Sequence, residues 1–88
     1  MEYKRLEKII KGFGNHNRLR ILELLKEKPN LSVVEISEKL RIGYINTSDH
    51  IRKMTISGLL TKHSNGPSVL HKLTSRGETV LVFCKRLK

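Results

Sequence analysis

The segment from Gly43 to Leu60 has the sequence G-Y-I-N-T-S-D-H-I-R-K-M-T-I-S-G-L-L. Its apolar or semi-apolar side chains recur at spacings of four and three residues, at Thr47, Ile51 and Met54. This spacing predicts one buried face of an α-helix over residues 44–57. Gly58 predicts the end of the helix, because helices commonly end at a glycine in the left-handed conformation.

The opposite face of this expected helix carries small, polar or flat side chains, which are the kinds that can approach DNA base edges. They are Tyr44, Ile45, Ser48, Asp49 and Arg52. A carboxylate is unusual on such a surface, because it repels phosphate. Asp49 either accepts a hydrogen bond from cytosine N4 or pairs with Arg52 three residues on, and we favour the pairing.

The composition indicates one small domain with a polyanionic partner. The chain has 88 residues, enough for a single domain over 1–88, and its 18 Lys and Arg against 8 Asp and Glu give a net charge of +10. No Asp or Glu lies between Asp49 and Glu78, whereas Arg and Lys recur there. The alternative is that the charge serves only solubility.

The only cysteine, Cys84, leaves no internal disulfide and suits a reducing compartment. No apolar run approaches the ~18 residues of a membrane span, and no signal peptide is recognisable. We therefore expect a cytoplasmic, nucleoid-associated protein with no membrane partner. We expect Cys84 to be a packed side chain, although Lys85 and Arg86 could favour a reactive thiolate.

Three helices are expected before the segment described above. An apolar stripe predicts a first helix over 3–13, and a very apolar second helix runs from a cap at Asn17 to about Glu27. Ser32 and Glu35 form a capping-box pattern for a third helix that ends at Leu40. The turn at 41–43 then joins two short helices, as in a helix-turn-helix.

Two arginines in the first turn of the second helix, Arg18 and Arg20, oppose its dipole. A bound phosphate or a salt bridge to a nearby Glu would relieve this mismatch, and we favour the salt bridge.

A β-hairpin and a last helix are expected after Gly58. Residues 59–64 and 69–73 have strand patterns, and the intervening N-G-P-S is a turn. Thr74 or Ser75 can cap a helix over 75–87, although the run V-L-V-F at 80–83 is also compatible with a strand. The expected order is α-α-α-α-β-β-α, a mainly α fold in which the hairpin is a wing.

Several motifs are similar to those of the arsenical-repressor (ArsR/SmtB) family of winged helix-turn-helix regulators. G-N-H-N-R-L-R-I-L at 14–22 resembles the family's G-D-P-T-R-L-R-I-L, and residues 31–40 resemble its L-S-V-x-E-L-A-x-x-L. S-D-H-I at 48–51 and G-L-L at 58–60 resemble its S-x-H-L and G-L-V. L-T-S-R-G at 73–77 is closer to MarR-like repressors. The resemblance implies a winged-helix, DNA-binding transcription regulator.

The chain departs from the family at its metal sites. Ser32 and Val34 stand where the metal sensors have cysteines, and the last helix contains no histidine. The four histidines, His16, His50, His63 and His71, fall in separate elements without ligand spacing. We therefore expect no metal and no other cofactor. Tyr44 and Ile45 replace a Gln-Ser pair that faces DNA in the family, so base preference does not transfer.

These observations predict a sequence-specific regulator that binds double-stranded DNA as a homodimer. The helix at 44–57 would enter the major groove, while the wing at 61–72 would contact backbone or minor groove. The expected DNA-binding residues are Tyr44, Ile45, Asn46, Ser48, Asp49, Arg52, Lys53, Lys62, His63, Asn65 and Lys72. The helices at 3–13 and 75–87 would dimerise through Leu6, Ile9, Ile10, Phe13, Leu81, Phe83 and Leu87.

Two other functions fit the composition. One is a non-specific architectural protein that coats DNA, and the other is a winged helix that binds an acidic protein. Catalysis is not expected, because the sequence has no nucleophile–base pair at recognisable spacing and no glycine-rich phosphate loop.

Overall fold

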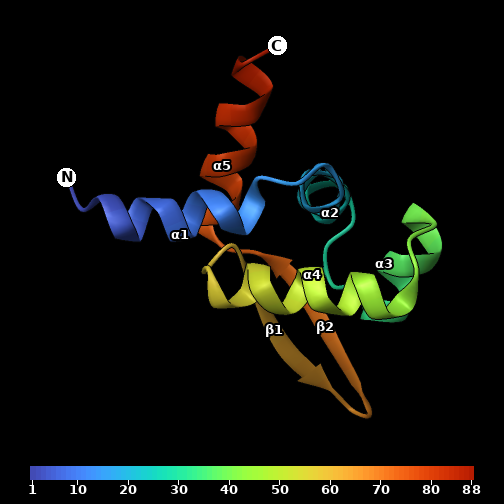
Figure 1. The fold of residues 1–88 in the computed structure, drawn as a ribbon. Helices are drawn as coiled ribbons and strands as arrows, with labels where there is room; N and C mark the ends of the chain where they lie inside the picture. The colour runs from blue at the N-terminus through green and yellow to red at the C-terminus, as the bar shows by residue number, and fades with distance from the viewer.

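The computed structural model describes all 88 residues, which form five helices and one antiparallel hairpin (Figure 1). In chain order the elements are α1 Tyr3–Phe13, α2 His16–Glu27, α3 Val33–Leu40, α4 Tyr44–Ile56, β1 Leu60–Asn65, β2 Ser68–Leu73 and α5 Ser75–Arg86. This order confirms the predicted winged helix-turn-helix fold. None of the helices is both long and apolar enough to cross a membrane.

The hydrophobic core is centred on α2. Ile21, Leu22 and Leu25 of this helix are buried, and α2 packs against α3, α4, β2 and α5. The other buried apolar residues are Leu31, Ile36, Ile51, Met54, Leu59, Leu60, Val80 and Leu81. The α4 helix therefore turns its predicted face inward, and its buried Thr47 hydroxyl donates a hydrogen bond to the Gly43 carbonyl oxygen.

The helix ends mostly follow the predicted capping chemistry. Ser32 and Glu35 form the reciprocal capping box, and Thr74 caps α5 by accepting from the Gly77 amide. The expected cap at Asn17 is wrong, because the side chain of Asn15 accepts from the amides of Asn17 and Arg18 and α2 begins at His16. Gly58 follows α4 with φ of 77°, the left-handed conformation that was predicted.

The hairpin is held to the body of the domain through His71. The strands pair from Leu60 opposite Leu73 to Asn65 opposite Ser68. The first strand lies one residue later than the predicted 59–64, and the second begins one residue before the predicted 69–73 and ends as predicted. The amide of His71 donates to the carbonyl of Leu31 over 2.9 Å, and the His71 carbonyl accepts from the Asn30 amide. The loop between α2 and α3 thus pairs with β2 and anchors the wing beside α4.

The first and last helices extend away from the body of the domain (Figure 1). Within α1 only Gly12 is fully buried, and of its apolar stripe Leu6 and Ile10 are exposed while Ile9 and Phe13 are half-buried. The V-L-V-F run is helical, which excludes the strand alternative. Val80 and Leu81 enter the core, whereas Val82 and Phe83 face outward.

Candidate nucleic-acid interface

The outward face of α4 is a stripe of four residues, with two charged side chains in the middle and an isoleucine at each end. Ile45, Asp49, Arg52 and Ile56 lie three or four residues apart, on the side opposite the buried Thr47, Ile51 and Met54. Ile45 is 81% exposed and Ile56 is 74% exposed. Ile56 was not among the predicted site residues, although the helical period that selects Asp49 and Arg52 also selects it.

Asp49 forms ion pairs with two cations on this surface. Its carboxylate accepts from Arg52 Nη2 at 2.8 Å and lies 3.1 Å from Lys53 Nζ. The hydrogen bond from Arg52, followed by that from Lys53, holds the Asp49 pKa below its usual value. The favoured pairing with Arg52 is therefore present, and the three side chains together retain one positive charge.

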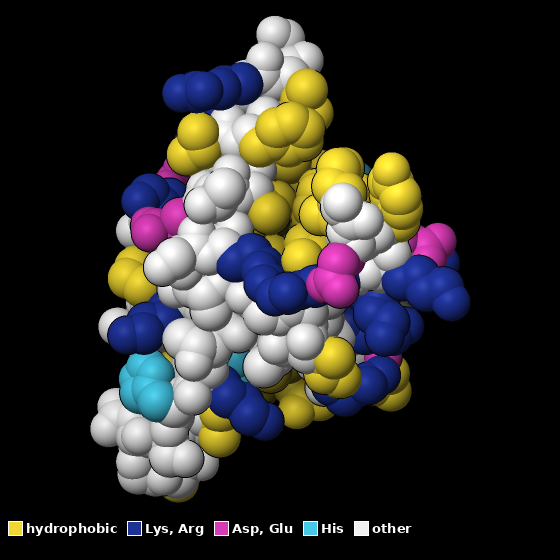
Figure 2. All heavy atoms as spheres, turned by 90° about the vertical axis from the view of Figure 1, so that its left-hand side faces the viewer, with side chains coloured by type: hydrophobic (Ala, Val, Ile, Leu, Met, Phe, Trp, Pro, Cys, Tyr) yellow, Lys and Arg dark blue, Asp and Glu magenta, His cyan; other side chains and the backbone are white.

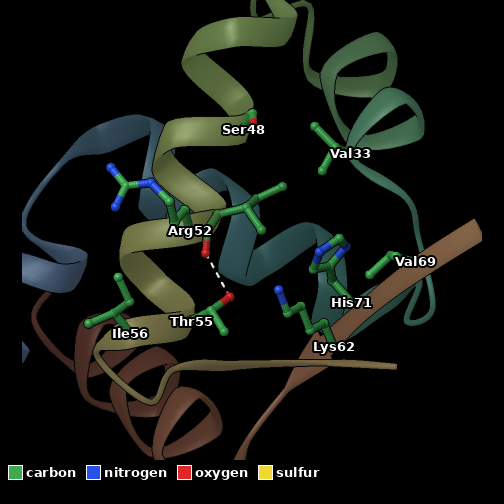
Figure 3. A pocket seen from close by; sticks show the side chains of 9 residues that line it. Val33, Ser48, Arg52, Thr55, Ile56, Lys62, Val69 and His71 are labelled. Atoms are coloured by element: carbon green, nitrogen blue, oxygen red, sulfur yellow. Dashed lines mark hydrogen bonds between the residues drawn. The ribbon is translucent and has the colours of Figure 1, made fainter. Parts of the chain in front are cut away.

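A groove of about 360 Å³ separates α4 from the wing (Figure 3). Its lining includes Ser48, Ile51, Arg52, Thr55 and Ile56 from α4, Val33 from α3, and Lys62, Val69 and His71 from the hairpin. Lys62 points into the groove, whereas the Arg52 guanidinium points away from the hairpin (Figure 3). No carboxylate lines the groove, so Lys62 makes it attractive to an anion.

The floor of the groove contains the His71 ring, which is only 3% exposed. Its Nδ1 lies 2.9 Å from the Leu31 carbonyl oxygen. Because a carbonyl oxygen can only accept, Nδ1 carries the proton in the neutral ring. The sequence predicted only that His71 lies in a strand, and its partner could not be foreseen because Leu31 is 40 residues away.

The two faces of the wing carry different predicted residues. Lys62 pairs across the hairpin with His71, so both side chains point toward α4. Lys72 lies opposite Thr61 and His63 lies opposite Leu70, which puts these two pairs on the other face. The predicted wing residues therefore do not form one contact surface, and Lys62 is the one that faces the groove.

A second hollow, of about 280 Å³, lies on the other side of the outward stripe. It is lined by Lys8, Lys11, Gly12, Arg18, Lys53, Ile56 and Ser57, without any carboxylate. Sequence reasoning missed Lys8 and Lys11, because no local pattern brings the end of α1 next to α4.

Arg18 and Arg20 do not form the salt bridges to glutamate that the sequence suggested. Arg18 donates to the Lys11 carbonyl oxygen at 2.8 Å and to the His50 ring, while Arg20 donates to the Leu40 carbonyl oxygen at 2.8 Å. Carbonyl oxygens at the ends of α1 and α3 thus take the place of the expected carboxylates.

The predicted DNA-binding residues all lie on α4 or the wing, and each is at least partly exposed. Of the predicted dimer residues, Leu6, Ile10, Phe83 and Leu87 are exposed, and Ile9 and Phe13 are half-buried. Leu81 is only 6% exposed, because it packs in the core, so it has little surface for a partner. Tyr3 on α1 and Val82 on α5 are also exposed apolar residues, and they were not among the predicted dimer residues. Figure 2 views the molecule from the side on which α1 projects and shows hydrophobic side chains gathered in the upper part of that face, beside α5.

No three of the His, Cys, Asp and Glu side chains come together as metal ligands would. Cys84 is half-buried on α5 beside the core.

Comparison with known proteins agrees with this geometry. Residues 15–61 match the family described as winged helix-turn-helix DNA-binding. The chain belongs to this family. No protein of curated function matches the sequence significantly.

Solved structures of regulators superpose on nearly the whole chain. HlyU from Vibrio cholerae is 26% identical, with a TM-score of 0.83 over 99% of this chain and 97% of HlyU. The transcriptional repressor PagR of Bacillus anthracis is 23% identical, with a TM-score of 0.80 over 94% of this chain and 99% of PagR.

A third structure is the homodimeric winged helix-turn-helix domain of Mb0332 from Mycobacterium bovis, a possible ArsR-family regulator. It is 16% identical, with a TM-score of 0.86 over 97% of this chain and 79% of that domain. These superpositions support the winged helix-turn-helix fold over nearly the whole chain.

Proposed function

We propose that this protein is a sequence-specific transcription regulator that binds double-stranded DNA as a homodimer. The observation that carries the proposal is the position of the outward stripe of α4 between two hollows that contain lysine and arginine but no carboxylate. The DNA major groove accommodates an α-helix and is bordered by two phosphate strands. A helix inserted there needs cations on both sides, and α4 has them.

In this arrangement each hollow receives one phosphate strand. Lys62 would contact the strand that passes between α4 and the wing. Lys8, Lys11 and Lys53 would contact the strand on the opposite side. Phosphate contacts of this kind fix the register of a protein on DNA, while side chains on the outward stripe meet the bases.

Base contacts would come from the amino-terminal half of α4. Tyr44, Ile45 and Ser48 lie in its first turns, and amino-terminal residues of recognition helices are the ones that contact base edges. Asn46 and Asp49 adjoin them, and Asp49 would act mainly by orienting Arg52. The remaining predicted wing residues, His63, Asn65 and Lys72, would contact the backbone or the minor groove.

The homodimer would form through the projecting helices. Ile10 on α1 and Phe83 on α5 are each 54% exposed, and Leu6, Val82 and Leu87 add further uncovered apolar surface. Burying such surfaces in a second copy is favourable, and the homodimeric state of the Mb0332 domain supports this mode. A symmetric dimer would present two α4 helices to half-sites one helical turn apart, about 34–36 Å.

Selection from a library of random DNA duplexes tests the proposal. We expect the protein to enrich a two-fold symmetric sequence whose half-sites are centred about 10 base pairs apart. Recovery of unenriched DNA would indicate a non-specific coat protein, and recovery of no DNA would favour the acidic-protein partner.

A matched pair of charge reversals locates the binding surface. Lys53→Glu should abolish retention of the selected duplex, because it inverts a charge beside the outward stripe. Lys88→Glu makes the same change at the end of the chain, beyond α5, and should not. Equal retention by both variants would show that α4 is not the binding surface.

A further inference from the structure

Ile45 is an exposed apolar side chain, and the next two residues of the outward stripe, Asp49 and Arg52, are charged. It lies in the first turn of α4 and is 81% exposed, so it contributes almost nothing to the core. A single exposed isoleucine on a protein surface ordinarily needs no explanation. This one projects from the face that the proposed function sets against DNA bases.

We infer that Ile45 recognises the 5-methyl group of a thymine in each half-site, an inference that rests on the proposed function. Isoleucine has no hydrogen-bond donor or acceptor, so it cannot read the polar edges of guanine, adenine or cytosine. The thymine methyl group is the apolar feature that bases present in the major groove. Contact between the two removes apolar surface from water on both sides.

The neighbours of Ile45 favour this partner over an apolar protein surface. Asp49, one turn later on the same stripe, is paired with Arg52 and Lys53. A protein partner that covered Ile45 with apolar surface would also cover these charged groups and leave them without water, which is costly. A DNA major groove instead offers a methyl group close to phosphates, and the three side chains retain one positive charge.

The neighbouring polar side chains would complete the half-site contact. Tyr44 precedes Ile45, and Ser48 lies one turn further along the helix, beside the groove next to the wing. Both have hydroxyl groups that can donate to or accept from a base edge. The thymine assigned to Ile45 should therefore have neighbours that are recognised by hydrogen bonds.

Replacement of thymine by deoxyuridine tests the inference, because it removes the methyl group and leaves base pairing intact. Each thymine of the duplex selected from the random library is replaced in turn, symmetrically in both half-sites. We expect one position at which binding weakens about fourfold for each methyl group lost, the factor expected for one buried CH₂ group. Other thymines should show smaller changes.

Two variants assign the effect to a residue. Ile45→Ala should bind the thymine and deoxyuridine duplexes with equal affinity. Val34→Ala shortens another exposed β-branched residue, on α3, and should retain the full discrimination. Because neither side chain belongs to the core, both variants should keep the helical circular dichroism of the parent protein.

The outcomes separate this inference from the proposed function. A selected sequence without thymine, or one whose binding is insensitive to deoxyuridine at every position, overturns the inference about Ile45 but not the proposed function. Discrimination that survives in Ile45→Ala overturns it as well. Failure to enrich any sequence overturns both the inference and the proposed function, and that result appears before deoxyuridine is used.

Discussion

Arg18 at the start of α2 donates a hydrogen bond from Nε to the Nδ1 of His50 on α4, over 3.0 Å. The same guanidinium donates to the Lys11 carbonyl oxygen at the end of α1. One side chain therefore connects α2, α1 and α4. Since Nδ1 accepts this hydrogen bond, the His50 ring is neutral and carries its proton on Nε2.

Removing the Arg18 side chain should destabilise the fold more than removing that of Arg20. Arg18→Ala loses a partly buried hydrogen bond to His50 and an exposed one to Lys11, and should lower the free energy of unfolding by about 1–3 kcal/mol. Arg20 makes only exposed hydrogen bonds, so Arg20→Ala should cost less. Urea unfolding of both variants measures the difference. Equal losses would mean that the Arg18 connection contributes nothing specific.

Protonation of His50 should destabilise the protein in mildly acidic solution. Burial, and next the positive charge of Arg18, lower its pKa from the ordinary value of 6.5. The unfolded chain then binds the proton more tightly than the folded one, so stability is lost as pH falls below about 6.5 and levels off below the folded-state pKa.

The variant His50→Asn isolates this contribution. Its Oδ1 can accept from Arg18 in place of Nδ1, but it does not titrate. Urea midpoints measured between about pH 7.5 and 5 should fall less steeply for the variant than for the parent. Parallel curves would contradict the prediction.

Lys62 should contribute to DNA affinity without contributing to sequence preference. It points into the groove beside α4, where a phosphate strand is proposed to pass (Figure 3). Lys62→Ala should reduce the slope of log affinity against log salt by about 0.9, the value for one lost phosphate contact. Binding to selected and scrambled duplexes should weaken by the same factor.

Lys88→Ala is the control for Lys62, because it removes the same charge beyond the end of α5. Its salt slope should match that of the parent. A slope unchanged by Lys62→Ala would remove the wing-side phosphate contact from the proposed interface.

A charge placed on the projecting helices should dissociate the proposed dimer. Ile10→Glu introduces a carboxylate into the exposed apolar stripe of α1, and burial of an unpaired charge in an interface is costly. Sedimentation at tens of micromolar protein should show a dimer for the parent and a monomer for this variant. Val34→Glu, an equally exposed site on α3, should remain dimeric. A monomeric parent would disprove the dimer.

The elements that follow local rules were predictable from the sequence. The period of α4 gave its buried and outward faces, and the Ser32–Glu35 capping box marked the start of α3. The sequence alone does not distinguish Asn15 from Asn17 as the cap of α2, because both residues have the same side-chain amide oxygen. The phase of α5 decides which part of V-L-V-F is buried, and that phase is set by packing against α2.

The parts of the interface that join distant segments were not predictable. The hydrogen bond between Arg18 and His50 spans 32 residues, and that between His71 and Leu31 spans 40. The second hollow likewise combines Lys8 and Lys11 with Lys53. In each case the helices must first pack before these side chains meet.

The ratio of affinities for the selected duplex and a scrambled duplex of equal length tests most directly whether α4 reads bases. Fluorescence anisotropy at about 200 mM salt should give a ratio of about 10³ or more, because non-specific binding collapses at this salt concentration. A ratio near one, with both affinities falling together as salt rises, would contradict base recognition and identify a protein that coats DNA.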